Sequence, residues 1–332
     1  MTHTQEYQET KRLQNRISSF MENFKFGTLL SGSGIRKLRG AKPLAVFATI
    51  FSLPFSGVNF SRGIVNNPEL EFRKDAAYEF LKNPRYNWRK FLLGLVTVVA
   101  RFMDVLTSEQ REKVLIIDDS TYDRSRSKVV ELLAWVHDHN ANRSLKGFKL
   151  MTLGWSDGVS FLPLDFILCS SSKASKRLQG IRKELDKRCC GYKRRLEAMA
   201  KSTEHLESMV KRALALGILS TKIDLADEEI VRIYGKPWDI EVFFKMMKHY
   251  LNLEREAQLR DYDGIIGHIT IVMSRYVFLA FEQRCHDDPR TLGSLFYACS
   301  EERQDLSLVE ARGYAAVAQP GLGQSQGCRH HR

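Results

Sequence analysis

The sequence has few cysteines at paired spacing, which argues against zinc sites and disulfide scaffolds. Six cysteines occur in 332 residues, and no two of them have the C-x2-C spacing that is typical of zinc ligands. Cys189 and Cys190 are adjacent, and adjacent cysteines rarely form a bridge with each other. We therefore expect neither a structural zinc site nor a disulfide scaffold, and we place the chain in a reducing cytoplasm.

Long uninterrupted apolar runs are also lacking. Residues 1–23 are polar and charged and contain no apolar core of a signal peptide. The two most apolar stretches are residues 44–55, which contain Pro54, and residues 91–106, which Arg101 and Asp104 interrupt. Both are shorter than the roughly 20 residues that a spanning helix needs. We expect buried core helices there and no membrane partner.

Acidic residues are too few to balance the basic ones. The chain has 51 Lys and Arg against 39 Asp and Glu, a net charge of +12. Thirteen Lys or Arg and five Asp or Glu lie between Lys173 and Arg212, so most of the excess is concentrated there. Such an excess favours a polyanionic partner, because bound phosphates release counterions. The charge is also compatible with a soluble basic protein that binds no polyanion.

The hydrophobic pattern changes along the chain in the order of an α/β protein. Residues 1–110 have helical periodicity, clearest in 74–81 and 88–106. Three strand candidates follow, and between the first two lies a short helix or loop at 129–137. A long basic helical stretch comes next. The strand candidates are residues 114–117, 148–155 and 159–168, and the helical stretch is 187–216.

Two further helices and a tail complete the chain. Pro237 occupies the favoured first position of an amphipathic helix, whose apolar residues recur at helical spacing. These are Ile240, Phe243, Phe244, Met247 and Leu251. Residues 262–285 predict another apolar helix, and residues 306–332 predict a disordered tail. We divide the chain into a helical region at 1–110, an α/β core at 111–305, and that tail.

Two places carry carboxylates that suit chemistry. Asp118 and Asp119 end the first strand candidate, where sites often form in α/β sheets and where Mg²⁺ finds oxygen ligands. On this feature alone we favour the simpler interpretation, in which they cap the strand and begin a turn with Ser120 and Thr121. Glu241 shares one helical face with Lys245 and Lys248. This group is either an ordinary surface ion pair or a metal ligand flanked by phosphate-binding cations.

The same residues resemble the signatures of insertion-sequence transposases of the DDE class. Tyr234, Glu241 and Lys248 fall on the pattern Y-x2-R-x3-E-x6-K, and Pro237 replaces its Arg. Asp119, followed by Ser120 and Thr121, matches the first motif of the family, so the match selects Asp119 rather than Asp118 as the first catalytic carboxylate. The resemblance covers most of residues 1–305. It implies an RNase H-like α/β catalytic core with a helical N-terminal domain and C-terminal helices.

The resemblance implies a mechanism as well. Asp119 and Glu241, with a further Asp, would hold two Mg²⁺ or Mn²⁺ ions about 3.5–4 Å apart that clamp the attacking and leaving oxygens of a phosphodiester. Tyr234, Lys245 and Lys248 would bind DNA phosphates. The partners implied are terminal inverted repeats, target DNA and further copies of the chain, in the cytoplasm on the nucleoid.

The second catalytic Asp of the family has no counterpart that we can find. The helical stretch runs almost directly into the Tyr234 motif, so a segment is missing around residues 218–219 and the core is incomplete. Asp224 is the candidate substitute if residues 218–223 replace the lost strand, although a helix N-cap is the interpretation we prefer for it. We therefore expect a transposase whose copy here is defective. The alternative is a catalytically dead protein that binds DNA or oligomerises and so inhibits an intact transposase. A third hypothesis, an unrelated nuclease using Asp118 and Asp119, leaves the Tyr234 motif unexplained.

Overall fold

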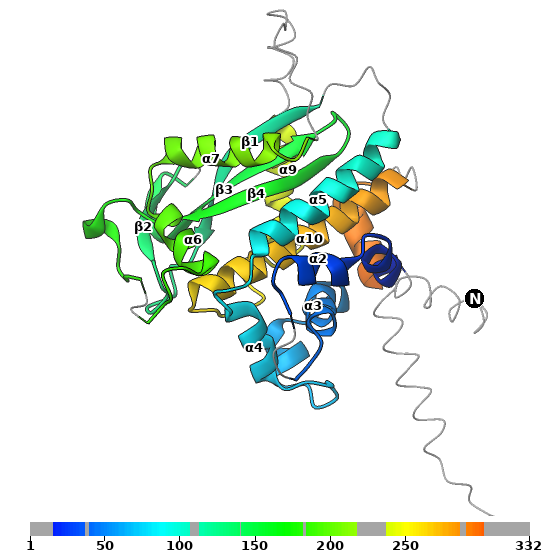
Figure 1. Ribbon diagram of the computed structural model, residues 1–332, viewed down its shortest axis with the longest axis horizontal. Helices are drawn as coiled ribbons and strands as arrows, with labels where there is room; N and C mark the ends of the chain where they lie inside the picture. The colour runs from blue at the N-terminus through cyan, green and yellow to red at the C-terminus, as the bar shows by residue number, and fades with distance from the viewer. Residues whose placement is uncertain are drawn as a thin grey trace, which may run out of the picture.

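The computed structural model of the chain is a mixed α/β structure (Figure 1). It describes residues 16–36, 40–106, 113–139, 141–181, 184–217, 237–285 and 290–301, with the backbone alone at 237 and 238. The expected tail at 306–332 and the expected deletion near 218–219 lie outside these ranges. Residues 16–23 and 292–301 are helical. The named helices are α2 (Phe26–Gly32), α3 (Pro43–Ser52), α4 (Lys74–Lys82), α5 (Trp88–Val105), α6 (Cys190–Ala198), α7 (Ser202–Leu214), α9 (Pro237–His249) and α10 (Tyr262–Cys285), with short helical turns at Pro54–Ser56, Ser61–Val65 and Ala174–Lys176.

The helices predicted before and after the sheet are confirmed. The side chain of Asn87 accepts a hydrogen bond from the backbone N–H of Lys90 and so caps the N-terminus of α5. The five apolar residues predicted on α9 and on the turn after it are all buried. The helical stretch predicted at 187–216 contains two helices: α6 ends at Ala198, and Lys201 has extended backbone angles before α7 begins.

One antiparallel sheet contains β1 (Val114–Asp123), β2 (Ala134–Asp138), β3 (Arg143–Ser156) and β4 (Phe161–Cys169). β1 pairs with one edge of β3, and β2 and β4 pair with successive parts of its other edge. The sequence prediction placed Asp118 and Asp119 at the end of a strand and β2 in a helix or loop. Both placements are wrong, because β1 continues through the two carboxylates and pairs with β3 over ten residues.

Helices cover both faces of the sheet. On one face Phe161 packs against Phe243 of α9, and Phe148 packs against Tyr262 of α10. On the other face Cys169 contacts His205 of α7. Figure 1 shows α7 on the near side of the sheet and α9 on its far side. The sheet is therefore the central layer, and α9 is positioned to meet β1.

The centre of the molecule is α10. In the described part of the chain, it is the one helix long and apolar enough to cross a membrane, and its apolar window is completely buried inside the protein, as is typical of a core helix. The N-terminal helices pack on it: Phe20 contacts Phe278 and Phe281. Buried residues from 17 to 299 form one hydrophobic cluster. The N-terminal helices therefore share their core with the helix that supports the sheet.

A buried arginine joins this helical core together. Arg275 of α10 donates to the backbone carbonyls of Ile50 and Phe51 at the end of α3, where a helix leaves carbonyls without partners. Its guanidinium also pairs with both carboxylate oxygens of Glu256, at 2.5 and 2.8 Å. Burial is the largest influence and raises the pKa of Glu256, but the charges and hydrogen bonds of Arg275 and His268 together outweigh it and lower that pKa.

Candidate active site

The two adjacent carboxylates of β1 point to opposite faces of the sheet, because side chains alternate along a strand. Asp119 pairs in register with Met151, and its Oδ1 accepts a hydrogen bond from Nζ of Lys149 at 2.6 Å. Asp118 pairs in register with Thr152. Its Oδ1 accepts the backbone N–H of Asp119 at 2.8 Å. Asp119 is therefore neutralised by a lysine, and Asp118 faces the side of the sheet that α9 covers.

Glu241 approaches this side of β1 from α9. The apolar face of α9 is buried, and Glu241, outside that face, is exposed. Asp239, two residues earlier, accepts a hydrogen bond from Oγ of Ser156 at 3.0 Å, which fixes the start of α9 to the end of β3. Residues of α9 and β1 also contact each other. The fold thus brings the predicted Glu241 to the strand that carries the predicted Asp119 and its neighbour.

The electrostatics of Asp118 depend on its burial and on the neighbouring carboxylates. The pKa of Asp118 is raised mainly by burial and further by the negative charges of Asp119 and Glu241, and the N–H of Asp119 and the charge of Lys149 oppose this increase. A carboxylate that two like charges destabilise is one that a bound cation would stabilise. This part of the site therefore fits a divalent metal ion, which takes carboxylate oxygens as ligands.

Only two carboxylates in the described part of the chain, Asp118 and Glu241, suit this metal ion. Within the ranges that the structure describes, no group of three His, Cys, Asp or Glu side chains is arranged to hold a metal ion. Asp224 and Tyr234, both predicted from the sequence, lie outside those ranges.

The two predicted lysines of α9 differ in their surroundings. Lys245 is exposed. Nζ of Lys248 lies 4.0 Å from Oε1 of Glu254, and the same oxygen accepts the backbone N–H of Asp123 at the end of β1. Burial is the largest cause of the raised pKa of Glu254. Lys248 is therefore held near the far end of β1, whereas Lys245 is available to a ligand in solution.

Lys149 and Glu254 were missed by the sequence reasoning. Lys149 is the one charged residue in the strand predicted at 148–155, and that interruption is the signal that could have identified it. Glu254 lies in a loop without a motif, and its role depends on the distant end of β1. Neither residue belongs to the signatures that directed attention to Asp119 and Glu241.

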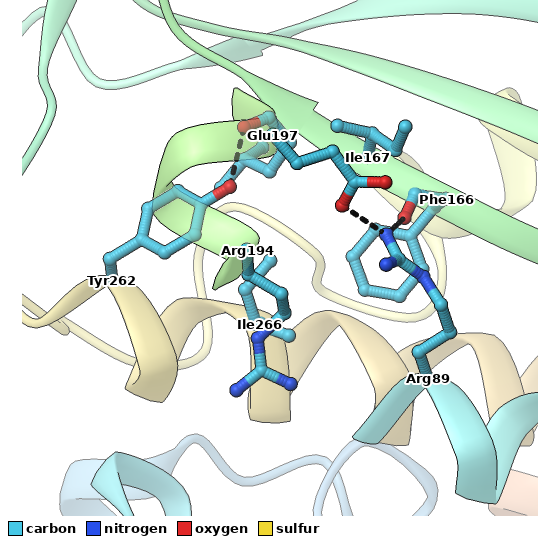
Figure 2. Close-up of a pocket in the computed structure, with 8 residues that line it drawn as sticks. Arg89, Phe166, Ile167, Arg194, Glu197, Tyr262 and Ile266 are labelled. Atoms are coloured by element: carbon cyan, nitrogen blue, oxygen red, sulfur yellow. Dashed lines mark hydrogen bonds and ion pairs between the residues drawn. The ribbon is translucent and has the colours of Figure 1, made fainter. Parts of the chain in front are cut away.

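A second charged cluster on the sheet is structural. Arg89 of α5 pairs with Asp165 of β4 at 2.8 Å and with Glu197 of α6 at 2.7 Å, and Arg212 of α7 pairs with the other oxygen of Asp165. Figure 2 shows Arg89 directed at the Glu197 carboxylate and at the carbonyl of Phe166. The adjoining cavity holds about 10 Å³. That is room for about one water molecule, so this cluster joins helices to the sheet and offers no space for a substrate.

Comparison with known proteins identifies a family whose match covers β1. A protein family described as DDE superfamily endonuclease matches residues 62–228, half of the chain. The match includes the whole sheet with Asp118, Asp119 and Lys149, and it ends before Glu241. The curated proteins contain no match to this sequence.

Proposed function

Because the chain belongs to the DDE superfamily of endonucleases, we propose that it is a transposase of a bacterial insertion sequence. Its class activity is cleavage of DNA at the element ends followed by strand transfer. The observation that carries the proposal is the position of Glu241 on α9, a helix that contacts β1, where its negative charge contributes to the raised pKa of Asp118. This pair joins the part of the chain that the family matches to the transposase-like motif outside it.

We assign the first metal-binding carboxylate to Asp118, although the sequence motif selected Asp119. Asp118 lies on the face of the sheet that α9 covers, whereas the carboxylate of Asp119 is bound by Lys149 on the opposite face. DDE superfamily endonucleases generally use divalent metal ions. Asp118 and Glu241 would hold Mg²⁺ or Mn²⁺, which would stabilise the negative charge that develops on the phosphodiester oxygens.

The chain's own residues have separate roles in this proposal. Lys245 is exposed beside Glu241 and binds a DNA phosphate, and Tyr234 and Lys248 bind phosphates near the element end. Lys149 holds Asp119 away from Glu241 and lowers the negative charge of the strand. The helices of residues 16–105 bind the element ends, and a second copy of the chain completes a synaptic assembly on the nucleoid.

We further propose that the sheet is an incomplete RNase H-like core. Among the described residues β1 has a strand partner on one edge only, and its apolar residues Leu115, Ile116 and Ile117 are each half-buried. A continuous apolar run is typical of a strand that is covered on both faces, as a strand inside a larger core would be. The lost neighbour would have carried the second catalytic Asp, and Asp224 is the candidate to replace it.

A second candidate function follows from the same observation. If β1 lacks a strand neighbour and Asp118 and Glu241 lack a third carboxylate, the chain binds DNA ends without cutting them. It would then inhibit an intact transposase by occupying its sites. The described part of the chain favours this alternative in one respect, the absence of a three-residue metal group.

A nicking assay separates the two functions. The substrate is DNA that carries the element's terminal repeats, incubated with Mg²⁺ or Mn²⁺ and wild-type protein, Asp118→Asn, Asp119→Asn or Glu241→Gln. Nicking that Asp118→Asn and Glu241→Gln both abolish supports the transposase, and nicking lost in Asp119→Asn alone restores the motif's assignment. Specific binding without nicking supports the inhibitor, and neither nicking nor specific binding refutes both.

A further inference from the structure

The strand β2 presents a row of aromatic side chains to solvent, at the end of the sheet away from α9. Trp135 is 45% exposed, and His137 and His139 are exposed, while the alternate residues Ala134 and Val136 are buried. The rings of His137 and His139 lie 4.9 Å apart at 83°. We call Trp135, His137 and His139 the β2 aromatic face.

The exposure of Trp135 is unusual within this protein. Trp88 and Trp155, by contrast, are at most 1% exposed. A single apolar residue on a surface is normal. Trp135 and His137 stand at alternate positions of β2 and His139 lies in the turn after it, and the adjoining loops add exposed Val129 and Leu178. Such a surface is suited to contact another flat, partly apolar group.

Cations surround this face on both edges. Lys146 is the direct cross-strand partner of Trp135, so the two side chains share one face of the sheet. Nζ of Lys146 donates to the carbonyl of Ser127, in a loop that also carries exposed Arg126 and Lys128. On the other edge, a backbone bridge between Ala134 and Arg177 holds a second basic loop against β2; its exposed members are Lys173 and Lys176.

The nearby acids do not cancel this charge. Glu131, in the turn before β2, accepts two hydrogen bonds from Arg195, at 2.6 and 2.7 Å, and is therefore paired within the protein. Asp138 accepts a backbone N–H from Ala141. The exposed charge around the β2 aromatic face is thus mainly positive, which complements a polyanion.

We propose that the β2 aromatic face binds single-stranded DNA. Unpaired bases stack on exposed aromatic rings, and lysines beside the rings bind the phosphates; this combination is typical of proteins that bind single strands. A duplex hides the faces of its bases and gains nothing from Trp135 as a stacking surface. The choice of DNA as the polyanion rests on the proposed function, whereas the stacking and charge do not.

The register of β3 gives the distance between the β2 aromatic face and the carboxylates. Trp135 pairs with Lys146, and Asp118 pairs with Thr152, six positions further along β3. At about 3.4 Å per residue this separation is about 20 Å, and the two partners Lys146 and Thr152 lie on the same side of β3. The bound strand therefore lies about 20 Å from the bond that Asp118 and Glu241 would act on.

Binding of fluorescent oligo-dT to the full-length protein tests the proposal by anisotropy, in the presence of EDTA so that cleavage plays no part. We expect Trp135→Ala to raise the Kd about tenfold, since a stacked base contributes about 1.4 kcal/mol, within the range for such contacts. Trp135→Phe retains a ring and should restore most of the affinity. Tyr297→Ala removes an aromatic side chain that is 57% exposed on the helix 292–301, and it should leave the Kd unchanged.

Salt dependence and a duplex of the same length complete the experiment. Removing the charge of Lys176 should reduce the slope of log Kd against log salt by about 0.7, because each phosphate contact to a single strand releases that fraction of a counterion. An unchanged Kd for Trp135→Ala overturns the proposal. So does an equal loss of affinity for duplex and single strand, since the face would then bind phosphates without stacking bases. Failure of the nicking assay leaves this prediction intact, so the two hypotheses fail separately.

Discussion

Asp118 on β1 and Glu241 on α9 lie close enough for the charge of Glu241 to contribute to the raised pKa of Asp118, after the larger effect of burial. The two carboxylates come from elements that are separated by the rest of the sheet, by α6 and α7, and by residues outside the described ranges. They meet because α9 packs its apolar face on the sheet and is fixed there by Asp239 and Ser156. This pair of like charges is the cation site that we propose.

The first prediction is that divalent ions stabilise the folded protein through Asp118 and Glu241. At about 100 times the Kd of Mn²⁺, binding to the folded state alone adds about 2.7 kcal/mol to the free energy of unfolding. Asp118→Asn and Glu241→Gln should each remove most of this gain, and Asp119→Asn should keep it, because Asp119 is bound to Lys149. Thermal unfolding with and without Mn²⁺ measures the effect. A loss confined to Asp119→Asn would assign the ion to the other face of β1.

The second prediction concerns pH. The pKa of Asp118 is higher in the folded protein than its ordinary value of 3.8. The unfolded chain therefore releases the proton first as pH rises, so ionisation of Asp118 lowers stability between its unfolded and folded pKa values. Asp118→Asn should thus be more stable than the wild type at neutral pH without metal. The gain should be below about 1 kcal/mol, because the carboxylate is half-exposed and water screens it.

Urea unfolding at a series of pH values checks this sign. The difference between Asp118→Asn and wild type should vanish below the unfolded pKa, near pH 4, where the carboxyl group is protonated in both states. A difference that stays constant across the pH range would indicate a packing effect of the amide and not the charge of Asp118.

The helices of this protein could be predicted from the sequence because their signals are local. The buried set on α9, from Ile240 to Leu251, follows from a spacing within one segment. The strands were predicted less well. β2 is five residues long, and its pairing with β3 stabilises it more than any propensity of Ala134–Asp138 does. Partners distant in sequence decide such elements.

The choice between Asp118 and Asp119 shows the same limit at the site. The motif identifies the pair of carboxylates, but a shift of one residue along a strand reverses the face that a side chain occupies. Which face matters depends on where α9 packs and on Lys149, which lies on another strand. Neither is encoded in the residues around Asp118. Glu241, in contrast, was selected by a motif whose Glu and Lys positions both lie on α9.

The third prediction is that Arg195 is essential for stability although it is remote from the carboxylates. Its side chain is completely buried and pairs with Glu131 and Asp263 at 2.6 Å. Arg195→Met would leave these carboxylates with one partner fewer in a buried position, which costs about 3–5 kcal/mol. Urea unfolding measures the loss. Lys211→Ala breaks an exposed pair with Glu207 and is the matched control, for which we expect an unchanged midpoint.

The fourth prediction tests whether the packing beneath α9 positions Glu241. Gly154 of β3 lies under the ring of Phe161, and a Cβ at residue 154 would be 2.1 Å from its Cζ atom. Phe161 in turn packs against Phe243 of α9, at 5.2 Å between ring centroids. Gly154→Ala should therefore displace the ring and destabilise the protein by about 1–3 kcal/mol. Gly180→Ala, with open space around it, should have little effect.

The same variant distinguishes a general loss of packing from a displaced site. If the ring transmits its displacement to α9, Gly154→Ala should also reduce the stabilisation by Mn²⁺, because Glu241 moves relative to Asp118. Adding Phe161→Leu removes the clashing ring, so the double variant should regain part of the Mn²⁺ effect even though the cavity costs stability. An Mn²⁺ effect that is unchanged in Gly154→Ala would mean that α9 holds Glu241 through Asp239 and Ser156 alone.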